Sequence, residues 1–236
     1  MKILAVDTST SINTVAACDA GVVLAETVVA CGRSHSERLL DTVDWVLGQA
    51  GLQLGEFDAL AVSVGPGSFT GLRVGVATWK GLAAGAGLGL VGVPTLDAMT
   101  RVACLDDAVV CVLLDARMKE VFGAVYEFQA GVRTKRGPES VAPVEQLLDG
   151  LPDRVLFLGD GALLYRDRIE ERVAEPVFAP SMLMVPRAAA VAAEAEALIA
   201  AGAPAEAARV APVYLRKSQA ELAAAEAGPR HEAGSP

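Results

Sequence analysis

The sequence has few of the residue types on which metal sites and nucleic-acid surfaces depend. Its 236 residues include 2 histidines, 4 cysteines and only 5% aromatic residues. Lysine and arginine together number 20 against 29 aspartates and glutamates, which gives a formal net charge of −9 at pH 7. An acidic chain lacks the broad basic surface that supplies most non-specific affinity for nucleic acids. We therefore expect no tight binding of RNA or DNA by the chain alone.

Long apolar segments and paired cysteines are also missing from the sequence. The first apolar run, 3–6, is interrupted by Asp7 and is too short for the core of a signal peptide. The uncharged stretch 81–96 falls short of the roughly 20 residues of a membrane span and contains Pro94. The four cysteines form no closely spaced pair of the metal or redox type. These absences predict a cytoplasmic protein with reduced thiols and no membrane contact.

The composition provides ample material for a folded core, since 53% of the residues are hydrophobic. In the first half, apolar patterns predict strands at 2–7, 13–18, 22–29 and 57–64, with helices at about 39–50 and 69–85. In the second half, they predict strands at 109–114, 120–128 and 154–158 and a helix at about 186–201. The class is therefore α/β.

The two halves follow one plan. In each, a strand ends at an aspartate, Asp7 or Asp115, and a turn leads into a second strand. Later in each half, a strand enters a glycine loop that precedes a helix, at 65–68 and at 159–161. This repetition predicts duplicated subdomains at 1–100 and 101–217, followed by a flexible tail at 218–236.

The turn after Asp7 leaves two interpretations open. In nucleotide-binding proteins of the actin or sugar-kinase type, a carboxylate at this place lies near the Mg²⁺ of the nucleotide, and glycines let the turn approach the phosphates. Here residues 7–11 are Asp-Thr-Ser-Thr-Ser, without glycine. The alternative is a turn closed by its own side chains, which the turn preferences of these residues favour.

Neither the glycine loop nor the histidines predict a catalytic, cofactor or metal site. The loop at 65–75 has no Walker lysine, and Ser68 is placed to cap the following helix. Four residues beyond His35 stands Leu39, so a helical pair of histidines cannot form there.

A partner surface is predicted on the first two helices. Trp45 falls opposite the apolar stripe of its helix, and small residues on the second helix form a smooth strip that another helix could approach closely. Packing within the chain remains an equal alternative for the strip. The predicted interface residues are Asp41, Trp45, Gly71, Gly75, Thr78 and Leu82.

The segments 3–9, 35–40 and 63–75 resemble the bacterial TsaB (YeaZ) family. The resemblance extends to 115–117, 120–122, 159–161 and 212–216 and so covers nearly the whole chain up to Lys217. One departure is Asp41, where the family pattern has proline.

The resemblance implies a duplicated actin-like fold, of the sugar kinase and Hsp70 ATPase type (ribonuclease H-like), that has lost catalysis. It implies two partners, the transferase TsaD and the ATPase TsaE, a homodimer when the chain is alone, and contact with tRNA only through the complex. That complex transfers threonylcarbamoyl from its adenylate to the adenosine 3′ of the anticodon, in tRNAs that read codons starting with A. An ATP-dependent small-molecule kinase and a metalloprotease are the alternative functions.

Overall fold

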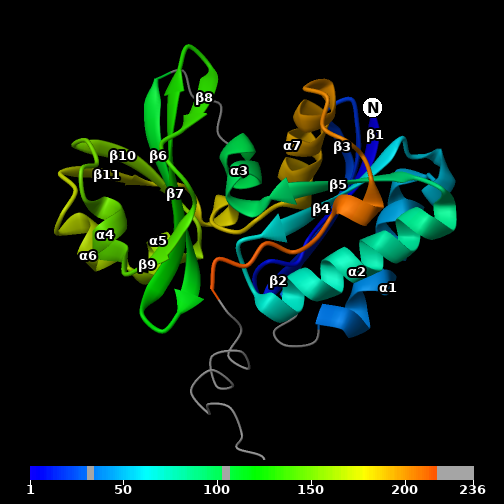
Figure 1. The fold of residues 1–236 in the computed structure, drawn as a ribbon, viewed down its shortest axis with the longest axis horizontal. Coiled ribbons are helices and arrows are strands. Elements are labelled where there is room, and N and C mark those ends of the chain that lie inside the picture. Colours follow the sequence, from blue (N-terminus) through cyan, green and yellow to red (C-terminus); the bar gives the residue numbers. More distant parts are fainter. Residues whose placement is uncertain (31–34, 103–106, 217–236) are drawn as a thin grey trace, which may run out of the picture.

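The computed structural model describes residues 1–30, 35–102 and 107–216, which form two α/β lobes (Figure 1). The strands of the first lobe are β1 (Lys2–Asp7), β2 (Ile12–Asp19), β3 (Val22–Ala30), β4 (Ala59–Gly65) and β5 (Gly89–Pro94). Those of the second are β6 (Ala108–Arg117), β7 (Glu120–Gln129), β8 (Val132–Lys135), β9 (Ser140–Ala142), β10 (Arg154–Leu158) and β11 (Glu175–Phe178). The helices are α1 (His35–Ala50), α2 (Phe69–Ala86), α3 (Thr95–Met99), α4 (Val144–Leu148), α5 (Asp160–Leu164), α6 (Arg166–Glu170) and α7 (Ala188–Ala200).

Both sheets have the same strand order. The first is β3-β2-β1-β4-β5, and the second, written in the corresponding direction, is β8-β7-β6-β10-β11, with β9 beside β7. In each sheet the central strand pairs antiparallel with the next strand in the chain and parallel with the strand that enters the glycine loop. The predicted duplication of an α/β unit is therefore confirmed.

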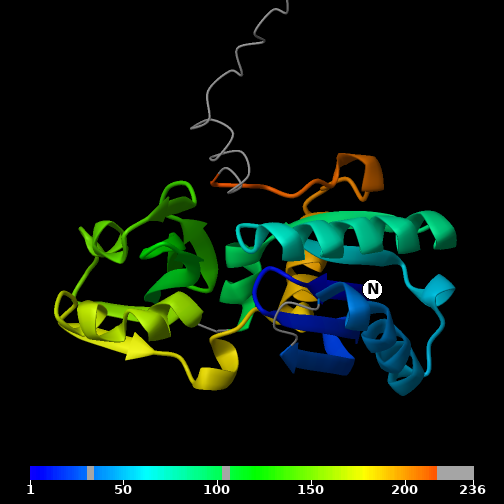
Figure 2. The ribbon, with the colours of Figure 1, turned by 90° about the horizontal axis from the view of Figure 1, so that it is seen from below.

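Side chains alternate between the two faces of each strand, and in the central strand β1 both sets are buried. Leu4 and Val6 of β1 face the apolar cluster made with α1 and α2, which lie on one side of the sheet. The largest side chain in this cluster is Trp79 of α2, whose indole N–H donates to the carbonyl oxygen of Leu4 at 3.3 Å. Figure 2 shows α2 and α1 from below, next to the first-lobe strands.

The opposite face of the first sheet is covered by α7. Ile3 and Ala5 of β1 pack in one cluster with Val191 and Ala195 of that helix. The second subdomain predicted at 101–217 includes α7, whereas the contacts of this helix place it on the first sheet. The predicted tail at 218–236 lies outside the described residues.

Several sets of contacts join the lobes, including an ion pair between Asp97 of α3 and Lys135 of β8. Glu194 of α7 forms ion pairs with Arg101, after α3, and with Arg133 of β8, where Nη2 and Oε1 lie 2.7 Å apart. Residues 210–216, which we name the C-terminal strap, cross from the first lobe to the second (Figure 1). In the strap, Val213 N donates to Val64 O at 2.7 Å, and Arg216 Nη1 donates to Ala116 O at 3.0 Å. Within the described ranges, no helix combines the length and apolar character needed to cross a bilayer.

Candidate functional site

The turn after β1 is buried and closed by its own side chains. Asp7, Thr8 and Ser9 are at most 2% exposed. Asp7 Oδ1 accepts hydrogen bonds from the backbone N of Ser9 at 2.9 Å and from its Oγ at 2.8 Å. Burial raises the pKa of Asp7 above its ordinary value, and the hydrogen bonds from Ser9 oppose that rise. Of the two interpretations of this turn, the structure shows the one in which the turn's side chains bond to its own backbone.

The start of α2 lies directly on this turn. Ser68 N donates to Ser9 O at 2.6 Å, and Thr8 Oγ1 donates to Gly71 O at 2.7 Å. A Cβ atom at Gly67 would lie 2.5 Å from Ser9 O, and one at Gly71 would lie 2.0 Å from Thr8 O. The glycines therefore allow the helix to meet the turn, and Ser68 caps the helix by accepting from Gly71 N at 3.3 Å, as predicted.

The buried part of this turn, Thr8 and Ser9, leaves no room for a nucleotide phosphate. Phosphates bind such turns through free backbone N–H groups and through space for close approach. Here the N–H of Ser9 is bonded to Asp7, and the space over Thr8 is filled by Gly71 and Gly75 of α2. No catalytic step through a nucleotide can be derived from this turn.

The corresponding turn of the second lobe is held differently. Asp115 Oδ1 accepts from Arg117 N at 2.8 Å, and Oδ2 forms an ion pair with Arg117 Nη1 at 3.1 Å. The backbone N of Asp115 donates to Asp160 Oδ1 at 3.0 Å, and burial raises the pKa of Asp160. Asp115 is thus fixed by its own hairpin. Across the described residues, no three His, Cys, Asp or Glu side chains are grouped to hold a metal ion.

The outward orientation predicted for Trp45 on α1 is observed. Its side chain is 51% exposed, and Leu40, five residues earlier, is 53% exposed. Asp41 between them is also exposed. Leu39, next to Leu40 in the sequence, is buried, because the 100° step between adjacent helical residues turns the two side chains in different directions.

The predicted strip on α2 is largely internal. Gly71 and Gly75 are buried, and a Cβ atom at Gly75 would lie 2.3 Å from Thr8 Oγ1 of the same chain. Thr78 is half-buried, and the half-buried Leu82 packs against the first-lobe core. The prediction that these glycines line a partner surface is therefore wrong. A residue without a side chain lets either a partner helix or a turn approach, and the sequence cannot distinguish the two.

A different strip of α2 faces outward. We name it the α2 outer strip; its members are exposed and follow at helical spacing, namely Arg73, Ala77, Gly81 and Ala84. A Cβ atom at Gly81 would meet nothing within 4 Å. The inward faces of α1 and α2 pack in one cluster on the same side of the first sheet.

Comparison with known proteins identifies the family of the chain. The family model described as "TsaD: tRNA N6-adenosine threonylcarbamoyltransferase" matches residues 13–224. The crystal structure of YeaZ from Pseudomonas aeruginosa is 30% identical, with a TM-score of 0.78, over 91% of this chain and 99% of that one. The chain belongs to the TsaB (YeaZ) family, within the wider TsaD family. The family resemblance found in the sequence is thereby confirmed.

Curated relatives carry the name "tRNA threonylcarbamoyladenosine biosynthesis protein TsaB". The protein from Escherichia coli is 43% identical over 129 residues, which are 54% of this chain and 55% of that protein. The one from Bacillus subtilis is 28% identical over 72% of this chain and 76% of its own length. The matched segment thus spans about half the length of the Escherichia coli relative.

More distant structures share only the fold. The ROK hexokinase from Thermus thermophilus is 13% identical with a TM-score of 0.50, over 86% of this chain and all of that one. These likenesses, together with the duplicated sheets, confirm the predicted actin-like, sugar-kinase type of fold.

Proposed function

We propose that the chain is a non-catalytic subunit of the machinery that makes threonylcarbamoyladenosine in tRNA, where it docks on and supports the TsaD transferase. TsaD would transfer threonylcarbamoyl from its adenylate to the exocyclic amine of the adenosine 3′ of the anticodon, with TsaE as the associated ATPase. The observation that carries the proposal is the closed turn, because Thr8 and Ser9 are buried beneath α2 where an actin-like ATPase would bind phosphate. The names of the curated relatives support the pathway.

The docking face of this proposal consists of the outer sides of α1 and α2. Its exposed aromatic and aliphatic side chains, Trp45 and Leu40, are of the kind that anchor protein interfaces. Ala77 and Gly81 would let a partner helix approach α2 closely. A second copy of the chain would use the same surface, so a homodimer would compete with binding of TsaD.

The alternative functions have less support. An ATP-dependent kinase needs an open phosphate turn, and this one is filled by the chain itself. A metalloprotease needs a metal-binding cluster, and the part of the chain that the structure describes contains none. The net charge of −9 favours contact with tRNA through the complex, since few phosphates could be neutralised by this subunit alone.

Reconstitution of the modification reaction tests the proposal. Purified TsaD and TsaE would be assayed with unmodified tRNA, with and without this chain, and we expect modification to depend on the chain. Trp45→Ala should weaken binding to TsaD by about 30-fold, the usual loss for an aromatic hot spot, while urea unfolding stays near wild type.

Val132→Ala is a matched control, since Val132 is 66% exposed but lies on β8 of the other lobe. Full modification in the absence of the chain would refute the scaffold role. Undiminished TsaD binding by Trp45→Ala would locate the docking face elsewhere on the chain.

A further inference from the structure

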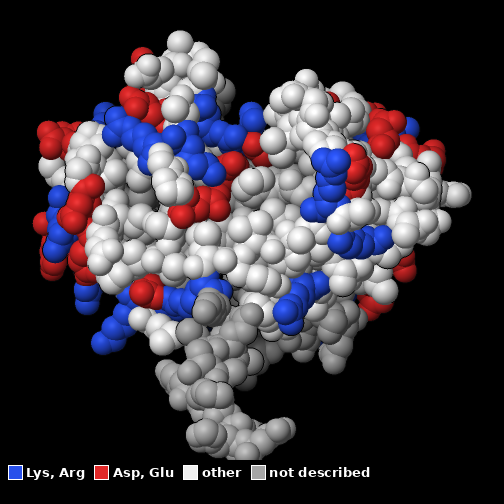
Figure 3. All heavy atoms as spheres, in the orientation of Figure 1, with Lys and Arg blue, Asp and Glu red and all other residues white. Residues whose placement is uncertain are grey.

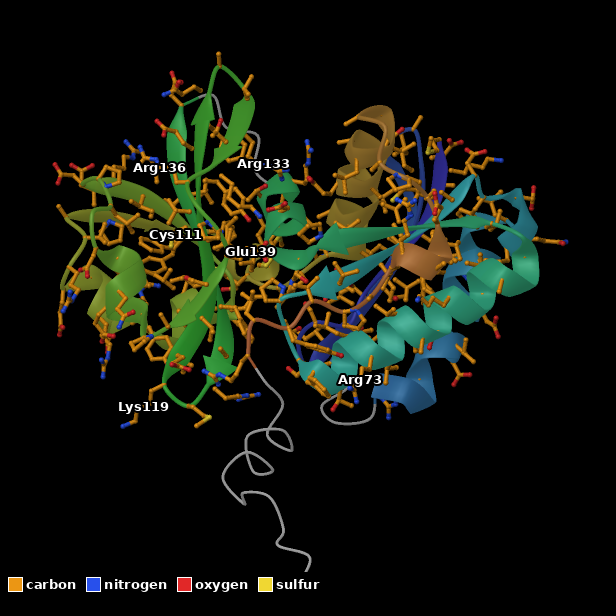
Figure 4. All side chains as sticks on the ribbon, in the orientation of Figure 1. Arg73, Cys111, Lys119, Arg133, Arg136 and Glu139 are labelled. Atoms are coloured by element: carbon orange, nitrogen blue, oxygen red, sulfur yellow. The ribbon has the colours of Figure 1, made fainter. Side chains whose placement is uncertain are left out.

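The guanidinium of Arg73 is held in place near the start of α2. Its Cζ atom lies 4.1 Å above the centre of the Phe69 ring, and its Nε donates to the hydroxyl of Tyr214 at 3.1 Å. The rings of Phe69 and Tyr214 stack at 4.4 Å. Tyr214 belongs to the C-terminal strap, which is fastened to β4 through Val213. Figure 4 labels Arg73 on the side of α2 that faces away from the sheet.

Among the described residues, none occupies the outer edge of this guanidinium. Arg73 is exposed, and its two terminal nitrogens form no hydrogen bond or ion pair with any described residue. Both arginines near or in the strap are paired within the chain, Arg209 with Glu206 and Arg216 with Glu120. A planar guanidinium whose Nε and face are already engaged keeps its two-nitrogen fork oriented, which favours bidentate binding of an anion.

The surroundings of Arg73 carry no competing carboxylate from its own helix or the flanking strands. From 59 to 96 the sequence contains no Asp or Glu, although the chain as a whole is acidic. The charged residues in this segment are Arg73 and Lys80. Figure 3 shows the lower right of the molecule, where α2 lies, as mostly uncharged atoms with separate Lys and Arg side chains.

We propose that the fork of Arg73 binds a carboxylate of the TsaD subunit that docks on α1 and α2, an inference that rests on the proposed function. A protein carboxylate is favoured over nucleic-acid phosphate because Arg73 is one fixed fork, seven residues from the next cation on its helix, and not part of a basic track. It also begins the α2 outer strip, whose next members, Ala77 and Gly81, suit a protein helix. Tyr214 is then a positioning residue.

Calorimetry with purified TsaD, in the absence of tRNA, tests this contact. Arg73→Gln should lower the affinity about tenfold or more, as for loss of a charge-assisted hydrogen-bonded pair. Arg73→Lys should lower it nearly as much, because lysine keeps the charge but not the fork. Tyr214→Phe should lower it by a smaller factor. Lys80→Gln, which removes a positive charge from the same helix, is the control and should stay within about twofold.

Thermal unfolding of each variant distinguishes a binding contact from a structural one, since Arg73→Lys should fold normally at this exposed position. Wild-type affinity in Arg73→Lys or Arg73→Gln would overturn the inference. A loss of affinity that appears only when tRNA is added would also overturn it, because it would identify phosphate as the ligand. So would weaker self-association, measured by sedimentation, with unchanged affinity for TsaD. A wild-type chain that fails to bind TsaD would instead overturn the proposed function, and this contact with it.

Discussion

The two lobes share one sheet order but differ at the turn that follows their central strand. In the first lobe, Thr8 and Ser9 are buried under α2, a helix of 18 residues. In the second lobe, the turn after Asp115 projects from the hairpin, and Met118 is 69% exposed. The helix that follows the second glycine loop, α5, has 5 residues. The turn of the same strand-turn-strand unit is thus buried against a helix in the first lobe and exposed in the second.

The backbone of the two turns reflects this difference. Arg117, Met118 and Lys119 all have positive φ, at 62°, 53° and 64°, although none is glycine. Left-handed conformations of such residues cost about 1–2 kcal/mol each. In the first turn the hydrogen bonds from Ser9 to Asp7 and the contacts of α2 fix the conformation. Packing against the long helix α2 therefore helps to fix the conformation of the first turn.

The largest effect is expected where α2 meets the first turn. Gly71→Ala would put a Cβ atom 2.0 Å from Thr8 O, and overpacking of this kind should lower the free energy of unfolding by about 3 kcal/mol. Urea denaturation measures it. Gly81→Ala is the matched control, since its Cβ meets open space and alanine's helix propensity should stabilise the chain by about 0.5–1 kcal/mol. Equal stability of Gly71→Ala and wild type would contradict the close contact.

A smaller effect of opposite sign is expected in the second turn. Met118→Gly should raise the free energy of unfolding by about 0.5–1 kcal/mol, because glycine adopts positive φ without the Cβ penalty, partly offset by its greater unfolded-state entropy. Ser9→Gly in the first turn should instead lower it by about 1 kcal/mol through loss of the hydroxyl hydrogen bond to Asp7. Chemical denaturation of both variants tests the contrast, which fails if they shift stability in the same direction.

The smallest effect is a difference in pH dependence at Asp7. Because the folded pKa is raised by burial, the folded state holds its proton more tightly than the unfolded state. Wild type should therefore lose stability as pH rises from the unfolded pKa through the folded one. Asp7→Asn cannot titrate, so its stability relative to wild type should increase with pH over that window. Urea midpoints at several pH values measure this, and a constant difference would show that Asp7 ionises in the folded chain as freely as in the unfolded one.

Local patterns predicted the secondary structure of the first lobe closely. The apolar run at 2–7 forms β1, and the glycine loop followed by Ser68 begins α2 with the expected cap. Short elements of the second lobe, such as β9 and β11, have too few residues to carry a periodic signal. The partner strip on α2 was misassigned because periodicity gives the relative angle of residues around a helix but does not say which neighbour each face meets.

The sequence by itself determined the duplicated α/β plan, the acidic charge and the lack of a histidine pair, because these depend on composition and on spacing along the chain. Only the tertiary structure decided that Gly71 and Gly75 meet Thr8, that α7 covers the first sheet, and that the strap fixes Arg73 through Tyr214. Each of these contacts joins segments far apart in the chain. Such contacts depend on how whole elements pack, and local residue preferences carry no record of that packing.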